Sequence, residues 1–374
     1  MIIKMSMYDT IIIGAGIAGA TLAHTLTQQN KKVLVVDKNG IASGGSGAAG
    51  AFVSPKIGLA SPLHSLTNEA FEVAKDFYMG HCPQYFTQTG VLRIPKDDTD
   101  AEKFPLYEKA NTNKYEKYDA QKLNTLGINA SYEGFYFPDA GDCDASAVCH
   151  FLLKDIEVTI AEVLGIEQKE TMWQLLTPHS SLLTKHIVIA TGYENTLFNM
   201  DYMGVHGIWG NRTDFSTSLD LPISMHQSMS VGANVGGTIK LGATHERRVE
   251  ETKPCEESEA KHLKDMASSL VDTSDFELQK IYCGMRAGSR DSFPLVGKVV
   301  DVQSMLEEHP SIKKGRMFPL KYIDNLYIYN GLGGRGFVFA PLMAKMLAEN
   351  IVNNKEIDKR VNPDRLFWKW CRKL

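Results

Sequence analysis

The pattern of apolar positions is clearest near the N-terminus. Ile11, Ile12 and Ile13 form a short apolar run, and residues 14–19 then read Gly-Ala-Gly-Ile-Ala-Gly. Residues 20–29 have the spacing of a helix, and a second apolar run at 33–36 ends on Asp37. This order predicts a strand, a tight glycine turn, a helix and a second strand that ends on an acid.

The rest of the chain alternates between helical and extended patterns. Apolar spacing predicts helices at residues 65–79, 115–126, 144–154 (capped by Asp142 or Asp144) and 258–270. We expect a strand pair at 86–94 that turns at Gly90, a polar, solvated excursion at 97–113, and a short aromatic strand at 134–138. Further strands are predicted at 156–160 (buried), 163–169, 172–177, 181–191, 222–231 and 238–243.

These elements predict an α/β protein of two structural domains. One is a Rossmann-like dinucleotide-binding domain made of residues 1–77, 141–203 and 281–374. The other is an α+β substrate domain with an antiparallel sheet, made of residues 78–140 and 204–280. We expect the chain to return to the cofactor domain at about Tyr282 and to stay there.

Composition limits the class of protein. The 374 residues are 43% apolar and 22% charged, which is ordinary for a soluble protein with a sizeable core. No apolar run approaches the ~20 residues of a membrane span, and residues 1–7 are too short for a signal peptide. We therefore expect a cytoplasmic protein without a membrane partner. The net charge of −4 argues against a generally basic nucleic-acid binder but leaves room for a local basic face.

The six cysteines have no metal-binding or redox-motif spacing. They stand at positions 82, 143, 149, 255, 283 and 371. We expect free thiols in a reducing compartment and no metal site. Covalent attachment of a flavin to one of them stays open.

The glycine turn suits a dinucleotide. Gly14 would form the tight turn, Gly16 would admit a pyrophosphate, and Gly19 would let helix and strand pack closely. Asp37 lies at the distance at which a carboxylate can hold ribose hydroxyls. An ordinary strand-to-helix turn is the alternative, and it would not require the acid. The expected binding residues here are Gly14, Ala15, Gly16, Ile17, Ala18, Gly19, Asp37 and Lys38.

The glycine turn fits NAD and FAD equally, but the next segment favours FAD. Residues 40–50 are almost all small, and such a loop suits a long dinucleotide that continues past its ribose. Backbone amides of Ser46, Gly47 and Ala48 would approach the second phosphate and the ribitol. Val158 is a candidate for adenine, although a plain core valine is an equal alternative. The small residues Ala190, Thr191 and Gly192 end a strand where a nucleotide would approach closely.

A late glycine motif adds a helix N-terminus. Residues 330–341 read Asn-Gly-Leu-Gly-Gly-Arg-Gly-Phe-Val-Phe-Ala-Pro and lead into a helix. Its amides and dipole suit the negative charge of a reduced flavin, although a plain helix start is the alternative. The candidates are Gly333, Gly334, Arg335, Gly336 and Phe337.

These motifs together resemble the glycine/D-amino-acid oxidase (DAO) family of FAD enzymes, whose cofactor domain is of the glutathione-reductase type. The resemblance rests on the glycine turn, on Arg-x-x-x-Arg-Asp-x-x-Pro-x-x-Gly from Arg286 to Gly297, and on residues 331–341. The last third, its closing Asn-Pro-Asp-Arg-Leu at 362–366, and the loop at 43–55 are similar to the oxidoreductase half of the MnmC group of bifunctional tRNA-modifying enzymes. Two departures are notable. The usual Ser-Gly-Asn-Arg of that loop is here Ser46-Gly47-Ala48-Ala49, and the flavin motif begins at residue 8, so we expect no methyltransferase half.

The resemblance implies a reaction and its partners. FAD would oxidise the carboxymethylaminomethyl group of a wobble (2-thio)uridine in tRNA, and hydrolysis of the imine would release glyoxylate and leave the aminomethyl base. Molecular oxygen would reoxidise the flavin, and a separate methyltransferase would act on the product. Arg286 matches the family position that binds the substrate carboxylate, with Arg290 or Arg335 in reserve. The alternative is that Arg286 pairs with Asp291 or with a core carbonyl. His206 and Tyr282 are weak candidates for an acid or base.

The C-terminal segment is basic and aromatic. Seven cations, Lys355, Lys359, Arg360, Arg365, Lys369, Arg372 and Lys373, stand among Phe367, Trp368 and Trp370. They would grip RNA phosphates and stack bases, or they would form a solvated helix with buried tryptophans. Two other functions stay open: oxidation of a small amine or amino acid, and a flavin-binding scaffold without catalysis.

Overall fold

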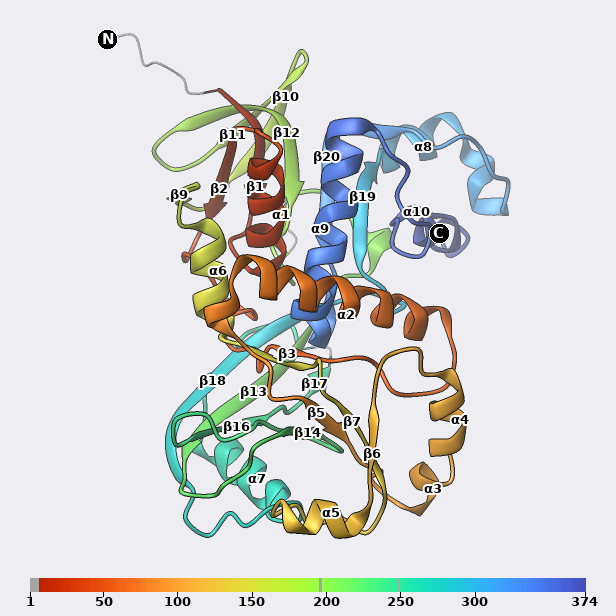
Figure 1. Ribbon diagram of the computed structural model, residues 1–374. Helices are drawn as coiled ribbons and strands as arrows, with labels where there is room; N and C mark the ends of the chain where they lie inside the picture. The colour runs from red at the N-terminus through yellow and green to blue at the C-terminus, as the bar shows by residue number, and fades with distance from the viewer. Residues whose placement is uncertain (1–6, 195–196, 248) are drawn as a thin grey trace.

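The computed structural model describes residues 7–194, 197–247 and 249–374, and it divides into two halves (Figure 1). One half is built on an eight-stranded sheet and the other on a nine-stranded sheet. A three-stranded sheet of β3 (Phe52–Val53), β8 (Gly141–Cys143) and β4 (Phe86–Thr87) links segments from several parts of the chain. In Figure 1 the long helix α2 (Pro62–His81) runs across the molecule between the two halves.

The eight-stranded sheet has a parallel centre. β1 (Met7–Ile13) lies between β2 (Val33–Asp37) and β12 (Ser181–Ile189), and β9 (Glu157–Ile160) pairs with β2 at the edge. β20 (Tyr322–Asn330) pairs in parallel with the end of β12. The antiparallel strands β10 (Gly165–Lys169), β11 (Met172–Leu176) and β19 (Leu295–Val300) complete it. Apolar side chains of β1 are buried on both faces, as expected for a central parallel strand.

Helices cover one face of this sheet. α1 (Ile17–Gln28) packs against α6 (Ala145–Leu153) and α9 (Gly336–Asn353), and α2 also packs on α9. Of the two predicted caps of α6, Asp142 and Asp144, the structure has Asp144, whose Oδ1 accepts a hydrogen bond from Ala147 N at 3.0 Å. On the other side lie α8 (Val302–Glu308) and α10 (Asp364–Cys371).

The nine-stranded sheet is mixed. β13 (His206–Ser216) pairs along its whole length with β18 (Glu277–Gly288), and its other edge carries β16 (Thr238–Gly242) and β17 (Glu246–Arg247). The sheet continues through β15 (Ser230–Val231), β14 (Ser224–His226), β5 (Val91–Arg93), β7 (Gly134–Phe137) and β6 (Glu116–Tyr118). The β5–β14 pair is parallel, so the sheet is not purely antiparallel. α7 (Glu257–Ala267) and α5 (Ala120–Thr125) bury apolar side chains in its core.

Several local predictions were wrong, each for a tertiary reason. β4 and β5 are not a hairpin, because β4 pairs with β8 and β5 pairs with β7. Residues 97–113 contain α3 (Asp98–Ala101) and α4 (Phe104–Ala110), and Phe104 is buried in the core. Residues 115–126 begin as strand β6 before α5, and β9 is half-exposed at the sheet edge rather than buried.

Two further corrections concern the second half. β18 remains in the nine-stranded sheet to Gly288, and β19 is the segment that rejoins the eight-stranded sheet, whereas we expected the return at Tyr282. Cys255 and Cys283 form a disulfide, so the prediction of six free thiols was wrong for these two. Their Cα atoms lie 5.7 Å apart although the residues are 28 positions apart, and cysteine spacing carries no signal of that proximity. No helix in the described ranges is long and apolar enough to cross a membrane.

Candidate active site

A cavity of about 720 Å³ lies where the two halves meet. The ends of β1, β2 and β20 and the residues that follow β12 contribute to its walls, as do β13, β14 and β18 of the second sheet. The volume falls within the range of sites that bind cofactors and small ligands. Parallel strands of an open α/β sheet bind ligands beyond their carboxyl ends, and this cavity lies there.

The glycine turn has the backbone that its sequence predicts. Gly14 has a φ of +115°, and a side chain there would collide with the carbonyl of Ala190. A side chain at Gly19 would collide with the carbonyl of Gly14, so this glycine allows α1 to pack against the turn. Gly16 lines the cavity, and its Cβ would lie only 2.9 Å from Ser46 Oγ. Gly16 precedes α1, so the helix amides begin at the cavity wall.

Asp37 organises this end of the cavity. Its Oδ2 accepts a hydrogen bond from Ala15 N at 2.8 Å, and its Oδ1 accepts from Asn39 N at 2.8 Å and Gly40 N at 2.9 Å. Lys38 also lines the cavity, and its Nζ pairs with Glu194. A half-buried carboxylate is thus held in place at the end of β2, where a ribose would need it.

The small-residue loop at 43–50 is sandwiched between the cavity and β18. Ser43, Gly44, Gly45, Ser46, Ala49 and Gly50 line the cavity. A side chain at Gly45 would collide with Met285 O, and one at Gly284 would lie 2.8 Å from Ala48 Cβ. The loop therefore requires small residues for two reasons. One of its sides faces the cavity, and the other contacts the backbone of β18. Ser46 Oγ accepts a hydrogen bond from Ile17 N at 2.9 Å, which ties the loop to the start of α1.

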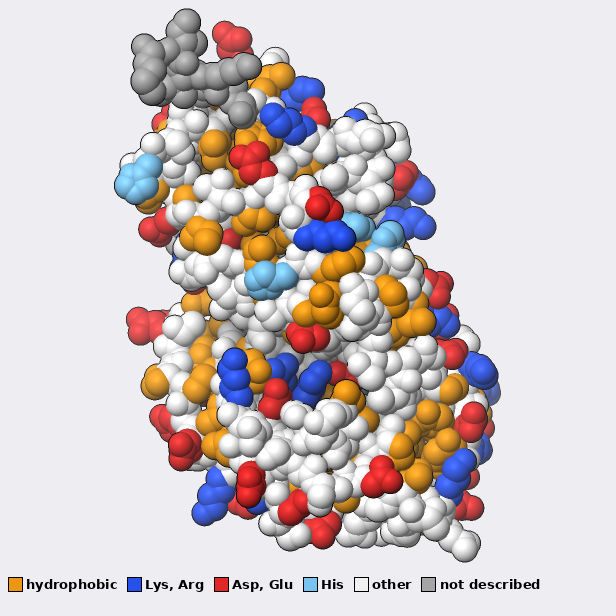
Figure 2. Space-filling model, turned by 60° about the vertical axis from the view of Figure 1, so that its left-hand side comes forward, with side chains coloured by type: hydrophobic (Ala, Val, Ile, Leu, Met, Phe, Trp, Pro, Cys, Tyr) orange, Lys and Arg blue, Asp and Glu red, His pale blue; other side chains and the backbone are white. Residues whose placement is uncertain are grey.

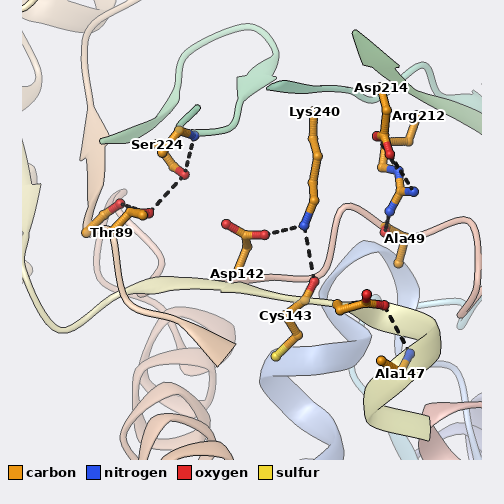
Figure 3. A network of polar contacts seen from close by, with 12 residues as sticks. Ala49, Thr89, Asp142, Cys143, Ala147, Arg212, Asp214, Ser224 and Lys240 are labelled. Carbon is orange, nitrogen blue, oxygen red and sulfur yellow. Dashed lines mark hydrogen bonds and ion pairs between the residues drawn. The ribbon is translucent and has the colours of Figure 1, made fainter. Parts of the chain in front are cut away.

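A buried ionic network holds the loop from behind (Figure 3). Arg212 donates from Nη1 to Ala49 O at 2.7 Å, and its Nε lies 3.2 Å from Asp214 Oδ1. The Arg212 guanidinium also lies 3.7 Å from the ring centroid of Tyr282. Beside it, Lys240 pairs with Asp142 of β8, and burial raises the pKa of that carboxyl. Figure 2 shows a narrow hollow between the two halves, bordered by side chains of both charges.

The late glycine motif forms the opposite wall. Gly331 and Gly333 have φ values of +70° and +59°, which allow the chain to turn from β20 into α9. Asn330 Nδ2 donates to Gly192 O at 2.7 Å and so ties this turn to the end of β12. Arg335 lines the cavity and donates from Nη1 to Ser54 O at 3.1 Å. Burial lowers its pKa to about 10, and no ion pair holds it within the described residues.

Arg286 projects from β18 into the second-sheet side of the cavity. Its Nη1 donates to Thr244 O at 3.1 Å, and burial lowers its pKa. It makes no ion pair with any carboxylate in the described parts of the chain, and Asp291 instead pairs with Arg365 at 2.8 Å. His245 lies nearby and also lines the cavity, and burial followed by the Arg286 charge lowers its pKa.

His226 is a polar wall residue that the sequence did not reveal. Its Nε2 lies 3.2 Å from Ser54 Oγ and its Nδ1 lies 2.7 Å from Ser230 Oγ. Burial, reinforced by Arg335 and Arg93, lowers its pKa to about 3, so the ring is neutral. His226 reaches the cavity only because it stands at the end of a short strand, and no sequence motif indicates that position. Arg212 likewise belongs to no motif, so the sequence did not predict its role.

The cavity brings together most predicted cofactor residues. Lining positions are Gly14, Gly16, Ile17, Ala18, Asp37, Lys38, Ser46, Ala190, Thr191, Gly192, Gly333, Gly334, Arg335, Gly336 and Phe337. Ala15, Gly19, Gly47 and Ala48 support the lining from the layer behind it. Val158 lies on β9, where it pairs with Val35 of β2, and it does not line the cavity. The cavity is lined instead by Ala161, Glu162 and Val163, which follow β9.

Other predicted residues lie outside the cavity. Arg290 is exposed beside Gly204, so it is a poor candidate for a catalytic residue. His206 Nδ1 lies 3.2 Å from Gly204 O, and Tyr282 is covered by Arg212. Neither lines the cavity. The only cysteine in the described lining is Cys283, and its disulfide leaves no thiol there for a covalent flavin bond.

The residues present fit FAD. A glycine-lined end with helix amides and a fixed carboxylate suits a dinucleotide, and the α9 terminus with Arg335 suits an anionic ring. The cavity also extends into the second half, beyond what the dinucleotide end requires, which leaves room for a substrate.

Comparisons with known proteins agree with this fit. The model of the FAD dependent oxidoreductase family (DAO) matches residues 9–350. Over 407 aligned residues the chain is 26% identical to the tRNA 5-methylaminomethyl-2-thiouridine biosynthesis bifunctional protein MnmC of Shewanella amazonensis, covering 98% of this chain and 60% of that protein. MnmC of Maricaulis maris is also 26% identical, with 91% and 51% covered. The chain thus spans about half to three fifths of the length of these relatives.

Solved structures share the fold. Glycine oxidase from Bacillus cereus superposes with a TM-score of 0.79 at 18% identity, covering 93% of this chain and 96% of that one. L-proline dehydrogenase from P. horikoshii superposes with a TM-score of 0.77 at 18% identity, covering 96% and 98%. The family match spans most of the sequence, and the cavity has the residues that an FAD enzyme needs. The chain therefore belongs to the DAO family of FAD-dependent oxidoreductases.

Proposed function

We propose that this enzyme oxidises the carboxymethylaminomethyl group of a wobble uridine in tRNA to the aminomethyl group, with release of glyoxylate. The names of its curated relatives support tRNA modification, and the DAO family supports oxidation of an amine. The observation that carries the proposal is Arg286, a cation in the cavity wall without a carboxylate partner among the described residues. Such a guanidinium is suited to the terminal carboxylate of the substrate.

Each half has a part in this proposal. We propose the eight-stranded half as the FAD domain and the nine-stranded half, which supplies Arg286, as the substrate domain. FAD held in this cavity would supply the oxidising chemistry, with hydride lost from the carbon between the amine and the carboxylate. The chain's residues bind and orient the substrate so that this carbon faces the cofactor. His245, kept neutral by burial beside Arg286, is placed to accept the proton of the substrate ammonium.

The proposed partners follow from the same reaction. Molecular oxygen would serve as the final electron acceptor. A methyltransferase on a separate chain would consume the aminomethyl product. Stopped-flow reoxidation of the reduced protein with oxygen and a search for labelled methyl transfer to its tRNA product would test these two points.

Bleaching of the oxidised-flavin absorbance under anaerobic conditions tests the function. The purified yellow protein is mixed with tRNA that carries the unprocessed carboxymethylaminomethyl group, and glyoxylate is measured after quenching. We expect bleaching with one glyoxylate per flavin reduced. The control is tRNA from cells that never attach this group, which should leave the flavin oxidised.

Oxidation of a small amino acid is the second candidate, because Arg286 would bind any small carboxylate. Parallel anaerobic mixing with glycine and sarcosine decides between the two. Bleaching by the free amino acids but not by tRNA would replace the tRNA proposal. A protein that stays yellow with every substrate would be a flavin-binding scaffold.

A further inference from the structure

A cluster of unpaired cations forms where the C-terminal helix meets a distant loop. η3 (Pro310–Lys314) packs on α10, and Gly315 lies against Arg372, with 3.7 Å between an added Cβ and Arg372 Cδ. The basic cluster consists of Lys313, Lys314, Arg316, Lys369, Arg372 and Lys373, all exposed. We propose that the basic cluster is the surface on which the RNA backbone docks, which rests on the proposed tRNA substrate.

The charges of the basic cluster are not neutralised by the protein. None of its six side chains makes an ion pair with another described residue. The nearby carboxylate of Glu308 is taken by Lys321, whose Nζ lies 2.7 Å from Oε1. By contrast, two cations of the same C-terminal stretch are engaged, since Arg360 pairs with Glu69 and Asp358, and Arg365 pairs with Asp291. The sequence alone could not separate these two groups.

The basic cluster is concentrated although the chain as a whole is acidic. The net charge is −4, yet three of the four residues 313–316 and three of the five residues 369–373 are cations. Lys369 lies in the last turn of α10, and Arg372 and Lys373 follow directly after the helix ends at Cys371. A dense, unpaired positive surface matches a polyanion, and phosphate contacts dominate the affinity of proteins for nucleic acids.

The helix and loop that carry the basic cluster pack on the protein core. Leu366, Phe367 and Cys371 of α10 are buried, and Trp368 and Trp370 pack against the same core, so these tryptophans do not project for base stacking. On the loop side His309 stacks on Phe318 with ring centroids 4.2 Å apart and planes 7° apart. The cations therefore project from fixed backbone, and the contacts we propose are to phosphates rather than to bases.

Charge reversal with a salt titration tests the docking surface. Holoprotein carrying Lys313→Glu, Lys314→Glu and Arg316→Glu is titrated with bulk tRNA at several KCl concentrations. We expect at least a tenfold loss of affinity at fixed salt and a fall of about 2 to 3 in the slope of log K against log salt, because three phosphate contacts are lost. A second variant reverses Lys369, Arg372 and Lys373 and should give the same result.

The matched control reverses Lys103, Lys109 and Lys114, which are exposed and unpaired in the described structure but lie in the other half of the molecule. Equal losses in this control, or no loss in either basic-cluster variant, would overturn the proposal. Preferred binding of anionic lipid vesicles by the basic cluster would also overturn it.

Binding is measured without turnover, so the two proposals can fail separately. Weaker tRNA binding in the basic-cluster variants would support the docking surface even if no tRNA bleached the flavin. Normal tRNA bleaching with unchanged binding in the variants would leave the proposed function intact and exclude this surface. Retained yellow colour and an unchanged melting temperature would show that the variants fold.

Discussion

At the scale of single residues, Arg286 is a cation kept inside the protein without a carboxylate beside it in the described chain. Its guanidinium stays protonated despite burial, because arginine does not lose its proton in proteins. We predict that Arg286→Ala keeps its flavin but loses about a hundredfold in kcat/KM, mainly through KM, since a charge-assisted pair is worth roughly 2–3 kcal/mol. Arg290→Ala, exposed and outside the lining, is the control and should stay near wild type. Colourless Arg286→Ala protein would show that this arginine binds the cofactor instead.

His226 makes folding stability depend on pH. Its folded pKa of about 3 lies below the ordinary value of 6.5, so the unfolded chain takes up the proton first. The contribution of His226 to the free energy of unfolding is therefore complete above pH 6.5. It decreases by up to about 1.4 kcal/mol per pH unit as the pH falls toward 3. Urea unfolding at pH 7.5 and 5.5 should show that wild type loses about 1 kcal/mol more than His226→Gln. Equal losses in the two proteins would contradict the burial of a neutral ring.

The sequence could reveal residues whose function follows from the local chain. The glycines of the first turn and Asp37 belong to one continuous motif, and Arg286 stands in a family motif. His226 and Arg212 act through neighbours such as Ser54 and Ala49 that lie far away in sequence. No spacing rule connects such pairs, so only the fold could reveal them.

At the scale of the element, two glycines of the first turn should separate into different roles. A methyl group at Gly19 collides with the carbonyl of Gly14, which the surrounding helix and strand hold in place. We predict that Gly19→Ala loses about 3 kcal/mol or more of stability. Gly16→Ala meets only the side chain of Ser46, so it should fold and bind FAD at least tenfold more weakly. Thermal unfolding without added FAD and the flavin content after purification measure both effects, and identical behaviour of the two variants would refute this division.

The loop at 43–50 is held by the Arg212–Asp214 pair of the other sheet, which we call the clamp. Arg212→Ala removes the hydrogen bond to Ala49 and leaves Asp214 buried without its partner, which costs about 3–5 kcal/mol. Replacing both Arg212 and Asp214 with leucine should recover most of this stability, because no unpaired charge remains. FAD affinity should remain about tenfold low in both variants. Recovery of FAD affinity in the double variant would show that the clamp serves stability alone.

Elements with a long periodic pattern were predictable, and short ones were not. The helices at α2, α6 and α7 follow from amphipathic spacing, since each buries one face. β4, β5 and β6 have two or three residues each and owe their conformation to partners in other segments. A two-residue strand has no period of its own, which is why the strand pair at 86–94 was misassigned.

At the scale of the whole molecule, the disulfide joins the connection before α7 to the cavity wall. We predict that unfolded protein titrates four thiols without reductant and six after reduction. Cys255→Ser should lower stability by about 3–4 kcal/mol, the chain-entropy value for a loop of this length. Cys255 is exposed and outside the cavity lining, so FAD content should hold. Six reactive thiols in unreduced protein would show that the pair is open under those conditions.

The fold class could be predicted because the glycine turn and the alternation of elements indicate a Rossmann-like α/β domain. The way the second sheet is assembled could not. β18 extends the second sheet well past the predicted boundary because its partner β13 runs its full length beside it. The length of β18 depends on which strand pairs with it, and a single sequence does not indicate which strands are neighbours.

The cavity walls come from both ends of the chain, and this has a consequence for biosynthesis. Gly14 and Gly16 leave the ribosome more than 300 residues before the opposing wall at 333–337. The pocket has no opposing wall until β20 and the start of α9 have been made, so FAD loading would follow translation of residues 331–337. Nascent chains arrested before residue 331 would remain colourless, and scarcity of flavin would leave complete but empty molecules rather than stalled ones.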